Sequence, residues 1–311
     1  MSARHGGEVA VALILDALVG EPPESLHPTV WMGRVISAFE ERAVELKGRF
    51  TRLLAGIVLA AALPTGVYLS VRRVLALAPR PLRRVLGAAL ISTSLSMRGL
   101  AAAAGVVERE LRRGDLERAR ARVGEMVGRD TERLSETEVA RAAVESVAEN
   151  ASDGVVAPML YGLLFGAPGA LTYKTINTLD SMVGYRTGPY RELGWASARL
   201  DDLANLLPAR ATVLAAGIVS GRPGRTLGAA WRYGPLTASP NAGWAEAAFA
   251  GVLGLRLGGA NVYGGVIRDA PILGDGRSPE PEDIRRAVRV MRRCCVLLAA
   301  VAILLGASGR G

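Results

Sequence analysis

The sequence predicts an all-α, polytopic integral membrane protein with broken or re-entrant spans and a charged helical segment. Half of the 311 residues are hydrophobic although 22% are charged. Several apolar runs approach the roughly 20 residues that cross a bilayer as a helix. Glycines and prolines interrupt some of these runs, and charges gather between them. Without an internal repeat or a linker, residues 1–311 are expected to form a single membrane-embedded domain.

The N-terminal 52 residues predict a first apolar element, a loop and a surface helix. Residues 8–20, EVAVALILDALVG, have neither a preceding basic cluster nor a following small-residue cleavage site, so we expect a retained span or half-span. Prolines and a glycine predict a loop over 20–34. This loop either closes over a site with His27 or forms an interfacial turn anchored by Trp31. Residues 34–52 predict a charged helix on the surface.

Two spans are expected next. Residues 53–71 contain no charge over nineteen positions, which predicts a transmembrane helix despite Pro64. Residues 85–107 predict a second span that Arg98 interrupts. A charged residue inside such a span must reach the interface, pair, or face a cavity.

A charged segment then leads into a broken span. Residues 108–152 are rich in Glu and Arg at helical spacing, typical of a solvated helix face. Ser135 and Glu138 have the spacing of a capping box, which predicts a helix from there to about residue 150. The sequence SDG at 152–154 is expected to end it. The uncharged run 154–173 contains prolines and glycines and predicts a broken or re-entrant span.

The remaining chain predicts further helices. A polar helix is expected from Lys174, and acids and an amide cluster within one turn at 201–205. Small residues recur every fourth position over 243–257, which predicts a closely packed helix. Glu246 is the one acid there that packing does not explain. Residues 279–307 predict a charged helix that becomes apolar.

Composition excludes several classes of function. The net charge is +9, but the basic runs flank apolar segments instead of forming a basic face with aromatic residues, so we expect no nucleic acid partner. Cys294 and Cys295 are adjacent and cannot make a zinc site. Only two histidines are present, which excludes histidine metal clusters and Ser-His-Asp catalysis. No Walker, Rossmann or HExxH motif is present.

The organising stretch of the chain is 145–210, where ionisable and amide residues sit among apolar, glycine-rich segments. Buried charges are costly unless they pair, bind an ion or line water. Each acid has a structural alternative, an ion pair with a nearby arginine that holds helices together. The whole set indicates carboxylates that hold phosphates through Mg²⁺, with basic residues neutralising phosphate oxygens. This pattern leaves open a membrane enzyme, such as a Mg²⁺-dependent diphosphate-using transferase, and a transporter or carrier for an anionic solute.

Candidate site residues follow from residue type. The expected catalytic residues are His27, Glu145, Lys174, Asp180 and Arg186. The expected residues for binding a phosphate-bearing cofactor are Asn150, Asn177, Arg199, Asn205 and Arg210. The expected metal ligands are Glu149, Asp153, Asp201 and Asp202.

Five blocks of the sequence resemble a known family. They are GEPPESLHPTVWMGRVI (20–36), ESVAENASDGVVAPMLYG (145–162), GAPGALTYKTINTLDSMVGYR (166–186), SARLDDLANLLPAR (197–210) and SPNAGWAEAAFAGVLGLRLGG (239–259). These blocks resemble the CbiB/CobD family of cobalamin-biosynthesis membrane proteins, the adenosylcobinamide-phosphate synthases. The resemblance covers most of residues 11–276.

The resemblance implies an enzyme that joins the propionate carboxylate of adenosylcobyric acid to (R)-1-amino-2-propanol or its O-phosphate. It also implies ATP and Mg²⁺ as cofactors and a multi-pass place in the inner (cytoplasmic) membrane. Because ATP and the corrinoid are cytoplasmic, the active face and the charged segment 108–152 are expected on the cytoplasmic side. The expected partners are the corrinoid, the amine and the lipid bilayer, with a second copy of the chain or other late corrin-pathway enzymes as further contacts. A carrier for a corrinoid remains the alternative.

Overall fold

The computed structural model describes residues 3–185 and 187–308, and helices make up nearly all of its regular structure. Four helical stretches of the described chain are long and apolar enough to cross a membrane. They are Arg49–Leu77, Arg80–Arg112, Glu136–Val183 and Trp195–Ser220. The first two contain the spans expected over 53–71 and 85–107. The predicted all-α membrane fold is confirmed.

The chain folds as two compact units, each assembled from separate stretches of sequence. The first unit takes the chain up to Ser96, Ala157–Asn205 and the chain from Ala299. The second takes Met97–Val156 and Leu206–Leu298. No single cut of the chain separates the units, and the expectation of one membrane-embedded domain over 1–311 stays a prediction.

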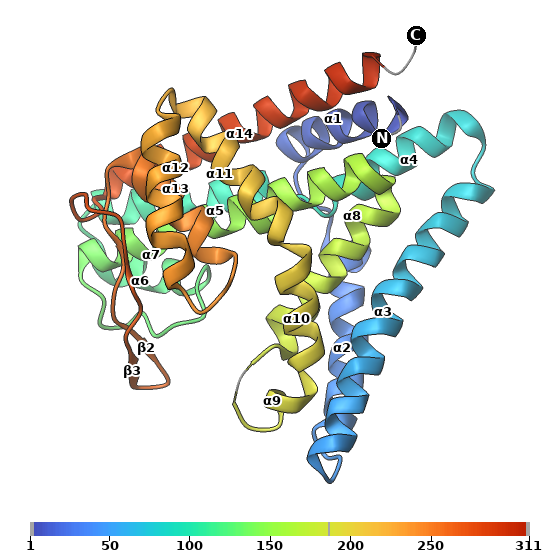
Figure 1. Cartoon of the computed structure of the whole chain (residues 1–311), viewed down its shortest axis with the longest axis horizontal. Helices are drawn as coiled ribbons and strands as arrows, with labels where there is room; N and C mark the ends of the chain where they lie inside the picture. Colours follow the sequence, from blue (N-terminus) through green and yellow to red (C-terminus); the bar gives the residue numbers. More distant parts are fainter. Residues whose placement is uncertain (1–2, 186, 309–311) are drawn as a thin grey trace. The chain divides into compact units, whose positions relative to one another are not determined.

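Helix α8 is the centre of the first unit (Figure 1). It packs against five neighbouring helices. The helices of this unit are α1 (Ala3–Leu18), α2 (Pro28–Ala43), α3 (Arg49–Leu77), α4 (Arg80–Ser92), α8 (Ala157–Val183), α9 (Tyr190–Leu193) and α10 (Trp195–Ala204). The apolar packing includes Ile36 of α2, Leu59 of α3, and Leu179 and Val183 of α8.

A break inside α8 confirms the prediction of a broken span. Gly166 has φ 70° and ψ −161°, and Pro168 follows it. A positive φ is readily adopted by glycine alone, and proline removes a backbone donor. His5 of α1 covers the break, with its Nδ1 3.3 Å from the Leu163 carbonyl oxygen. The Leu163 carbonyl oxygen, close to the break, is thereby placed beside a polar ring.

Two expectations for the N-terminal region are corrected. The loop expected over 20–34 is shorter, because a 3₁₀ turn, η1 (Glu24–Leu26), leads directly to α2 at Pro28. Proline at the first helical position has a pre-set φ, and His27 Nδ1 accepts the Thr29 N–H as the cap. The charged helix expected over 34–52 is divided at Gly48, whose φ of 94° separates α2 from α3.

The second unit is built around α7 and α13, which pack against each other (Figure 1). Its elements are α5 (Met97–Arg112), α6 (Leu116–Gly124), α7 (Glu136–Asn150), η2 (Ala151–Val156), α11 (Leu206–Ser220), α12 (Pro223–Tyr233), η3 (Gly234–Leu236), α13 (Ala242–Leu253) and the first part of α14 (Pro281–Ser308). Residues 243–245 and 247–253 of α13 are buried. This agrees with the close packing expected from its small residues.

The capping box that starts α7 is confirmed. The Ser135 side chain accepts the Glu138 N–H, and the Glu138 carboxylate accepts the Ser135 N–H at 2.8 Å. The expected end of this helix at 152–154 is wrong. The chain continues through η2, a π-helical turn that takes in Asp153 and Gly154, directly into α8.

The helix expected over 243–257 ends early. Gly254 adopts the left-handed conformation, with φ 71° and ψ 41°, which stops α13. Two small antiparallel pairs follow that the sequence reading did not anticipate. Strand β1 (Leu257–Gly258) pairs with β4 (Ile272–Leu273), and β2 (Asn261–Tyr263) pairs with β3 (Val266–Arg268).

Candidate functional site

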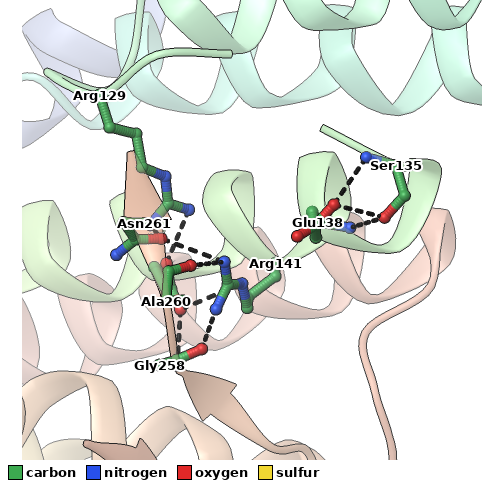
Figure 2. A network of polar contacts seen from close by, with 8 residues as sticks. Arg129, Ser135, Glu138, Arg141, Gly258, Ala260 and Asn261 are labelled. Atoms are coloured by element: carbon green, nitrogen blue, oxygen red, sulfur yellow. Dashed lines mark hydrogen bonds and ion pairs between the residues drawn. The ribbon is translucent and has the colours of Figure 1, made fainter. Parts of the chain in front are cut away.

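Several of the described candidate residues belong to two polar clusters, each inside one unit. In the second unit, α7 and the β1–β2 segment meet in an ion-pair network. We call this the Glu145 network, formed by Arg129, Arg141, Glu145, Gly258 and Asn261. Figure 2 labels Arg129, Arg141, Gly258 and Asn261.

The Glu145 carboxylate has partners on both oxygens. Its Oε2 accepts a hydrogen bond from Arg129 Nη2 at 2.9 Å. Its Oε1 accepts the Gly258 N–H at 2.7 Å and lies 3.9 Å from Arg141 Nε. Both side chains of the Arg129–Glu145 pair are shielded, with exposed fractions of 7% and 11%. A buried charge pair of this kind is stable only when its remaining hydrogen bonds are also satisfied.

Asn261 joins the two arginines of the network (Figure 2). Its Oδ1 accepts from Arg129 Nη1 at 2.6 Å and from Arg141 Nη2 at 3.0 Å. Arg141 also donates to the Gly258 and Ala260 carbonyl oxygens. The network therefore fixes the β1–β2 segment against α7 and the loop that precedes it.

A cavity of about 400 Å³ lies beside the Glu145 network, within the second unit. Its wall includes Glu145, Glu149, Glu246 and Arg129, together with the backbone of Gly258. A volume of this order is in the range of small-molecule sites. The cavity is thus a pocket with several acids and one guanidinium.

Glu246 on α13 is the functional candidate that the sequence-based list of site residues omits. Its flanking residues are buried, and its own exposed surface is part of the cavity wall. Burial raises the pKa of the Glu246 carboxyl well above its ordinary value, and the carboxylates of Glu149 and Glu145 raise it further. The available sequence signal was a single acid in an otherwise apolar helix of small residues.

Two expected cofactor-binding residues of this unit make hydrogen bonds within the protein. Asn150 Nδ2 donates to the Ser146 carbonyl oxygen at 2.9 Å, one turn back on α7. Arg210 Nη1 donates to Asn241 Oδ1 at 2.6 Å, and its guanidinium carbon lies 4.3 Å from the centre of the Trp244 ring. The Arg210 side chain therefore joins α11 to the start of α13.

The second polar cluster lies in the first unit, between α8 and α10. We call it the Asp201 cluster, formed by Tyr173, Asn177, Asp180, Asp201 and Asn205. Asp201 Oδ2 accepts from Asn205 Nδ2 at 2.9 Å, and Asp201 Oδ1 accepts from Asn177 Nδ2 at 3.5 Å. Tyr173 donates its hydroxyl hydrogen to Asn205 Oδ1 at 2.7 Å. The carboxylates of Asp180 and Asp201 are close enough to interact electrostatically.

Two basic residues flank the Asp201 cluster. Lys174 belongs to α8, one turn before Asn177 and Thr178. Arg199 Nη1 donates to Asp202 Oδ2 at 3.0 Å on the exposed side of α10. The expected site residue Arg186 lies outside the described residues.

His27 is close enough to Lys174 for their charges to interact. Burial lowers the pKa of His27; Glu21 opposes this effect and Lys174 adds to it. His27 Nδ1 accepts the Thr29 N–H, which places the proton of the neutral ring on Nε2, 3.6 Å from Glu21 Oε2. A role as proton acceptor would require His27 to give up its cap to α2.

The carboxylates suit a metal ion that arrives with phosphates. Among residues 3–185 and 187–308, no group of three or more His, Cys, Asp or Glu side chains is arranged to hold a metal ion. Mg²⁺ requires only one or two protein carboxylates when phosphates and water complete its octahedral shell. Asp180 and Asp201 form one such pair in the first unit. In the second unit, Glu149 and Asp153 both lie close enough to Glu246 to interact with it electrostatically. The donor set therefore fits phosphate-bridged Mg²⁺.

The chain is similar to known proteins over nearly its whole length. The model of the family described as CobD/Cbib protein matches residues 9–291. The chain is 39% identical to cobalamin biosynthesis protein CobD of Rhodobacter capsulatus, over 96% of this chain and 95% of that protein. It is 41% identical to cobalamin biosynthesis protein CbiB of Salmonella typhimurium, over 94% of this chain and 95% of that protein. It is 44% identical to CobD of Geobacter metallireducens, over 95% and 96%. No solved structure matches the chain.

Proposed function

The chain belongs to the CobD/Cbib protein family, and from this premise we propose that it is an ATP-dependent amide ligase of cobalamin biosynthesis. The proposed reaction joins the propionate carboxylate of adenosylcobyric acid to (R)-1-amino-2-propanol or its O-phosphate. The observation that carries the proposal is the family match over residues 9–291, which includes every residue of both polar clusters. The names of the relatives support the pathway, and the chemistry of the clusters supports the reaction type.

Amide formation from a free carboxylate requires activation of its oxygen. In the proposed reaction the substrate carboxylate attacks the γ-phosphorus of ATP, giving an acyl phosphate and ADP. The amine nitrogen then attacks the acyl carbon, phosphate leaves with the C–O electron pair, and the nitrogen loses a proton to a base. Both steps place several negative charges at one position, which basic side chains must balance.

The residues of this chain divide these tasks by type. Lys174, Arg199 and Arg186 would neutralise phosphate oxygens. Mg²⁺, when bound by the carboxylates, would shield the negative charge of the phosphates. Asp201 and Asp202 in one unit, and Glu149 and Asp153 in the other, would be its ligands. A carboxylate is the preferred proton acceptor, because both His27 nitrogens already have partners.

The direct test uses purified protein in detergent with adenosylcobyric acid, aminopropanol phosphate, ATP and Mg²⁺. We expect a new amide product that requires ATP. Asp180→Ala and Asp202→Ala should lose this product while the protein still inserts into membranes. Glu282→Gln, at an exposed position of α14, is the matched control and should retain activity. Unchanged activity in both aspartate variants would remove the metal proposal.

The break at Gly166 in α8 supports a second candidate function, because transporters commonly place discontinuous helices at their binding sites. In this alternative the protein carries a corrinoid or another anionic solute. Uptake of the unmodified corrinoid into liposomes, without any amide product, would favour the carrier over the ligase.

A further inference from the structure

The connection between α3 and α4 carries a concentration of positive charge. Helix α3 ends at Leu77 and α4 begins at Arg80 (Figure 1). The sequence contains no Asp or Glu from residue 46 to residue 107, so nearby positions do not balance this charge. Exposed arginines lie at the end of α3 and in the first turns of α4, and we call them the α3–α4 arginine cluster: Arg72, Arg73, Arg80, Arg83 and Arg84.

The arginines at the opposite end of α3 have an acidic partner. Arg49 Nε lies 2.8 Å from Glu192 Oε1, and Arg52 Nη2 lies 3.7 Å from Glu192 Oε2. Within the part of the chain that the structure describes, Arg72 and Arg73 have no such ion pair. The positive charge is therefore neutralised by protein at the first end of α3 and is left for another partner at the second end.

A cavity of about 740 Å³ lies beside the first turn of α4 and is lined mainly by basic side chains. Its wall consists of Glu8 of α1 and of Arg80, Pro81, Arg83 and Arg84 of α4. Glu8 is close enough to Arg84 for their charges to interact. Three guanidiniums against one carboxylate leave an excess of two positive charges in the wall, which suits an anionic group.

Exposed apolar side chains alternate with the arginines along the sequence. Val74 and Leu77 are 51% and 84% exposed at the end of α3, and Leu82 and Val85 are 53% and 64% exposed in α4. The cluster begins directly after the uncharged run 53–71, where this span leaves the hydrocarbon region of the membrane. A free anion would leave these apolar side chains uncovered, whereas a phospholipid supplies both a phosphate and acyl chains.

We propose that the α3–α4 arginine cluster binds the headgroups of anionic phospholipids. The planar guanidinium presents its N–H groups in a geometry that matches phosphate oxygens. A zwitterionic phospholipid carries a compensating cation and gains less from the excess charge of the cluster. The site belongs to the first unit alone, and it does not depend on whether the protein is a ligase or a carrier.

The test measures lipid binding to the purified full-length protein in detergent by native mass spectrometry. Phosphatidylglycerol should bind more tightly than phosphatidylcholine with the same acyl chains. The triple variant Arg72→Gln/Arg73→Gln/Arg80→Gln should weaken phosphatidylglycerol binding by at least about tenfold, because each basic side chain near an anionic headgroup contributes roughly fivefold. Its binding of phosphatidylcholine should not change. Arg83 is kept, because its Nη2 donates to two carbonyl oxygens at the end of α3.

A second triple variant removes the same amount of charge elsewhere. Arg118→Gln/Arg122→Gln/Arg232→Gln changes exposed arginines that pair with acids, and it should bind phosphatidylglycerol as the unmodified protein does. Equal weakening by the two triple variants would show that net charge alone attracts the lipid and would overturn the inference. Unchanged phosphatidylglycerol binding in the cluster variant would also overturn it. Displacement of the lipid by inorganic phosphate would identify a free-phosphate site instead of a lipid site.

A further measurement uses the unmodified protein, so it does not depend on the folding of a variant. A phosphatidylglycerol analogue with a photoreactive headgroup, added to the protein in phosphatidylcholine nanodiscs, should label residues within 72–85. Peptide mass spectrometry locates the label. Labelling that excludes this segment would overturn the inference whatever the variants show.

Discussion

Arg129 and Glu145 form an ion pair of 2.9 Å in which neither side chain is more than 11% exposed. The two residues come from different elements, the loop after α6 and the middle of α7. Their remaining hydrogen bonds go to Asn261 and to the Gly258 backbone. This pair therefore connects the charged helical segment to the β1–β2 segment, and its loss should affect the whole second unit.

Removal of one partner of this pair should be strongly destabilising. Arg129→Ala leaves the Glu145 charge buried with fewer partners, which costs about 3–5 kcal/mol. The measurement is the free energy of chemical unfolding of the purified protein in detergent. Arg118→Ala is the control, because the Arg118–Asp115 pair is 74% and 36% exposed and such pairs contribute less than about 1 kcal/mol. Equal losses for the two variants would contradict the buried role of Arg129.

The Asp201 cluster should be sensitive to one added methyl group. A Cβ atom at Gly184 would overlap the Asp180 carboxylate and lie 2.6 Å from the Asp180 carbonyl oxygen. We therefore expect Gly184→Ala to displace Asp180 and to lower the rate of amide formation about 100-fold, as misplacement by about 1 Å can do. Gly105→Ala, where no atom lies within 4 Å of the added Cβ, should leave the rate unchanged. Full activity of Gly184→Ala would show that the Asp180 position does not matter.

Glu246 should make stability depend on pH in the absence of ligand. Burial raises the pKa of its carboxyl in the folded state, so the folded protein binds a proton that the unfolded chain releases. The stabilising effect is complete below the ordinary glutamate value of about 4.5 and is lost as pH rises towards the folded-state pKa. Glu246→Gln does not titrate, so its stability relative to the unmodified protein should increase from about pH 4.5 upward.

The measurement for this prediction is the melting temperature of both proteins in detergent between pH 4 and 8. Glu282→Gln, at an exposed position, should follow the unmodified protein throughout. A constant difference between Glu246→Gln and the unmodified protein across this range would show that Glu246 keeps its ordinary pKa.

The parts of the fold that depend on local chemistry were predictable from the sequence. Ser135 and Glu138 form the expected capping box, because both halves of that motif lie within four residues. The uncharged run from 53 to 71 lies inside α3, as expected. This was predictable because the length and apolarity of a segment decide whether it can span a bilayer as a helix. The break in α8 follows from glycine and proline close together.

The parts that depend on distant contacts were not predictable in this way. The sequence SDG at 152–154 has the composition of a helix end, but the buried residues of η2 keep the chain helical. The strands after α13 are two or three residues long, too short for any periodic signal. Gly258 binds Glu145 across 113 positions of sequence, and no local pattern indicates such a contact.

The candidate site shows the same division. The residue types in 145–210 indicate acids and amides at a site, and the structure groups the described members within each unit. The sequence could not show that Glu145 is fully occupied by its neighbours. The partners of Glu145 include the Gly258 N–H of the β1–β2 segment, which only the folded chain brings beside α7.

The uncharged part of helix α3 has a length that matches the hydrocarbon thickness of a membrane. Arg52 and Arg72 lie twenty positions apart on this helix, about 30 Å along its axis. This distance equals the hydrocarbon thickness of a typical bilayer. Only 22% of the most apolar 18-residue stretch of α3 is buried by protein. Most of the surface of this stretch is therefore available to lipid chains. Hydrophobic mismatch in a thinner or thicker membrane would therefore act first on α3, by tilting it or deforming the lipid around it.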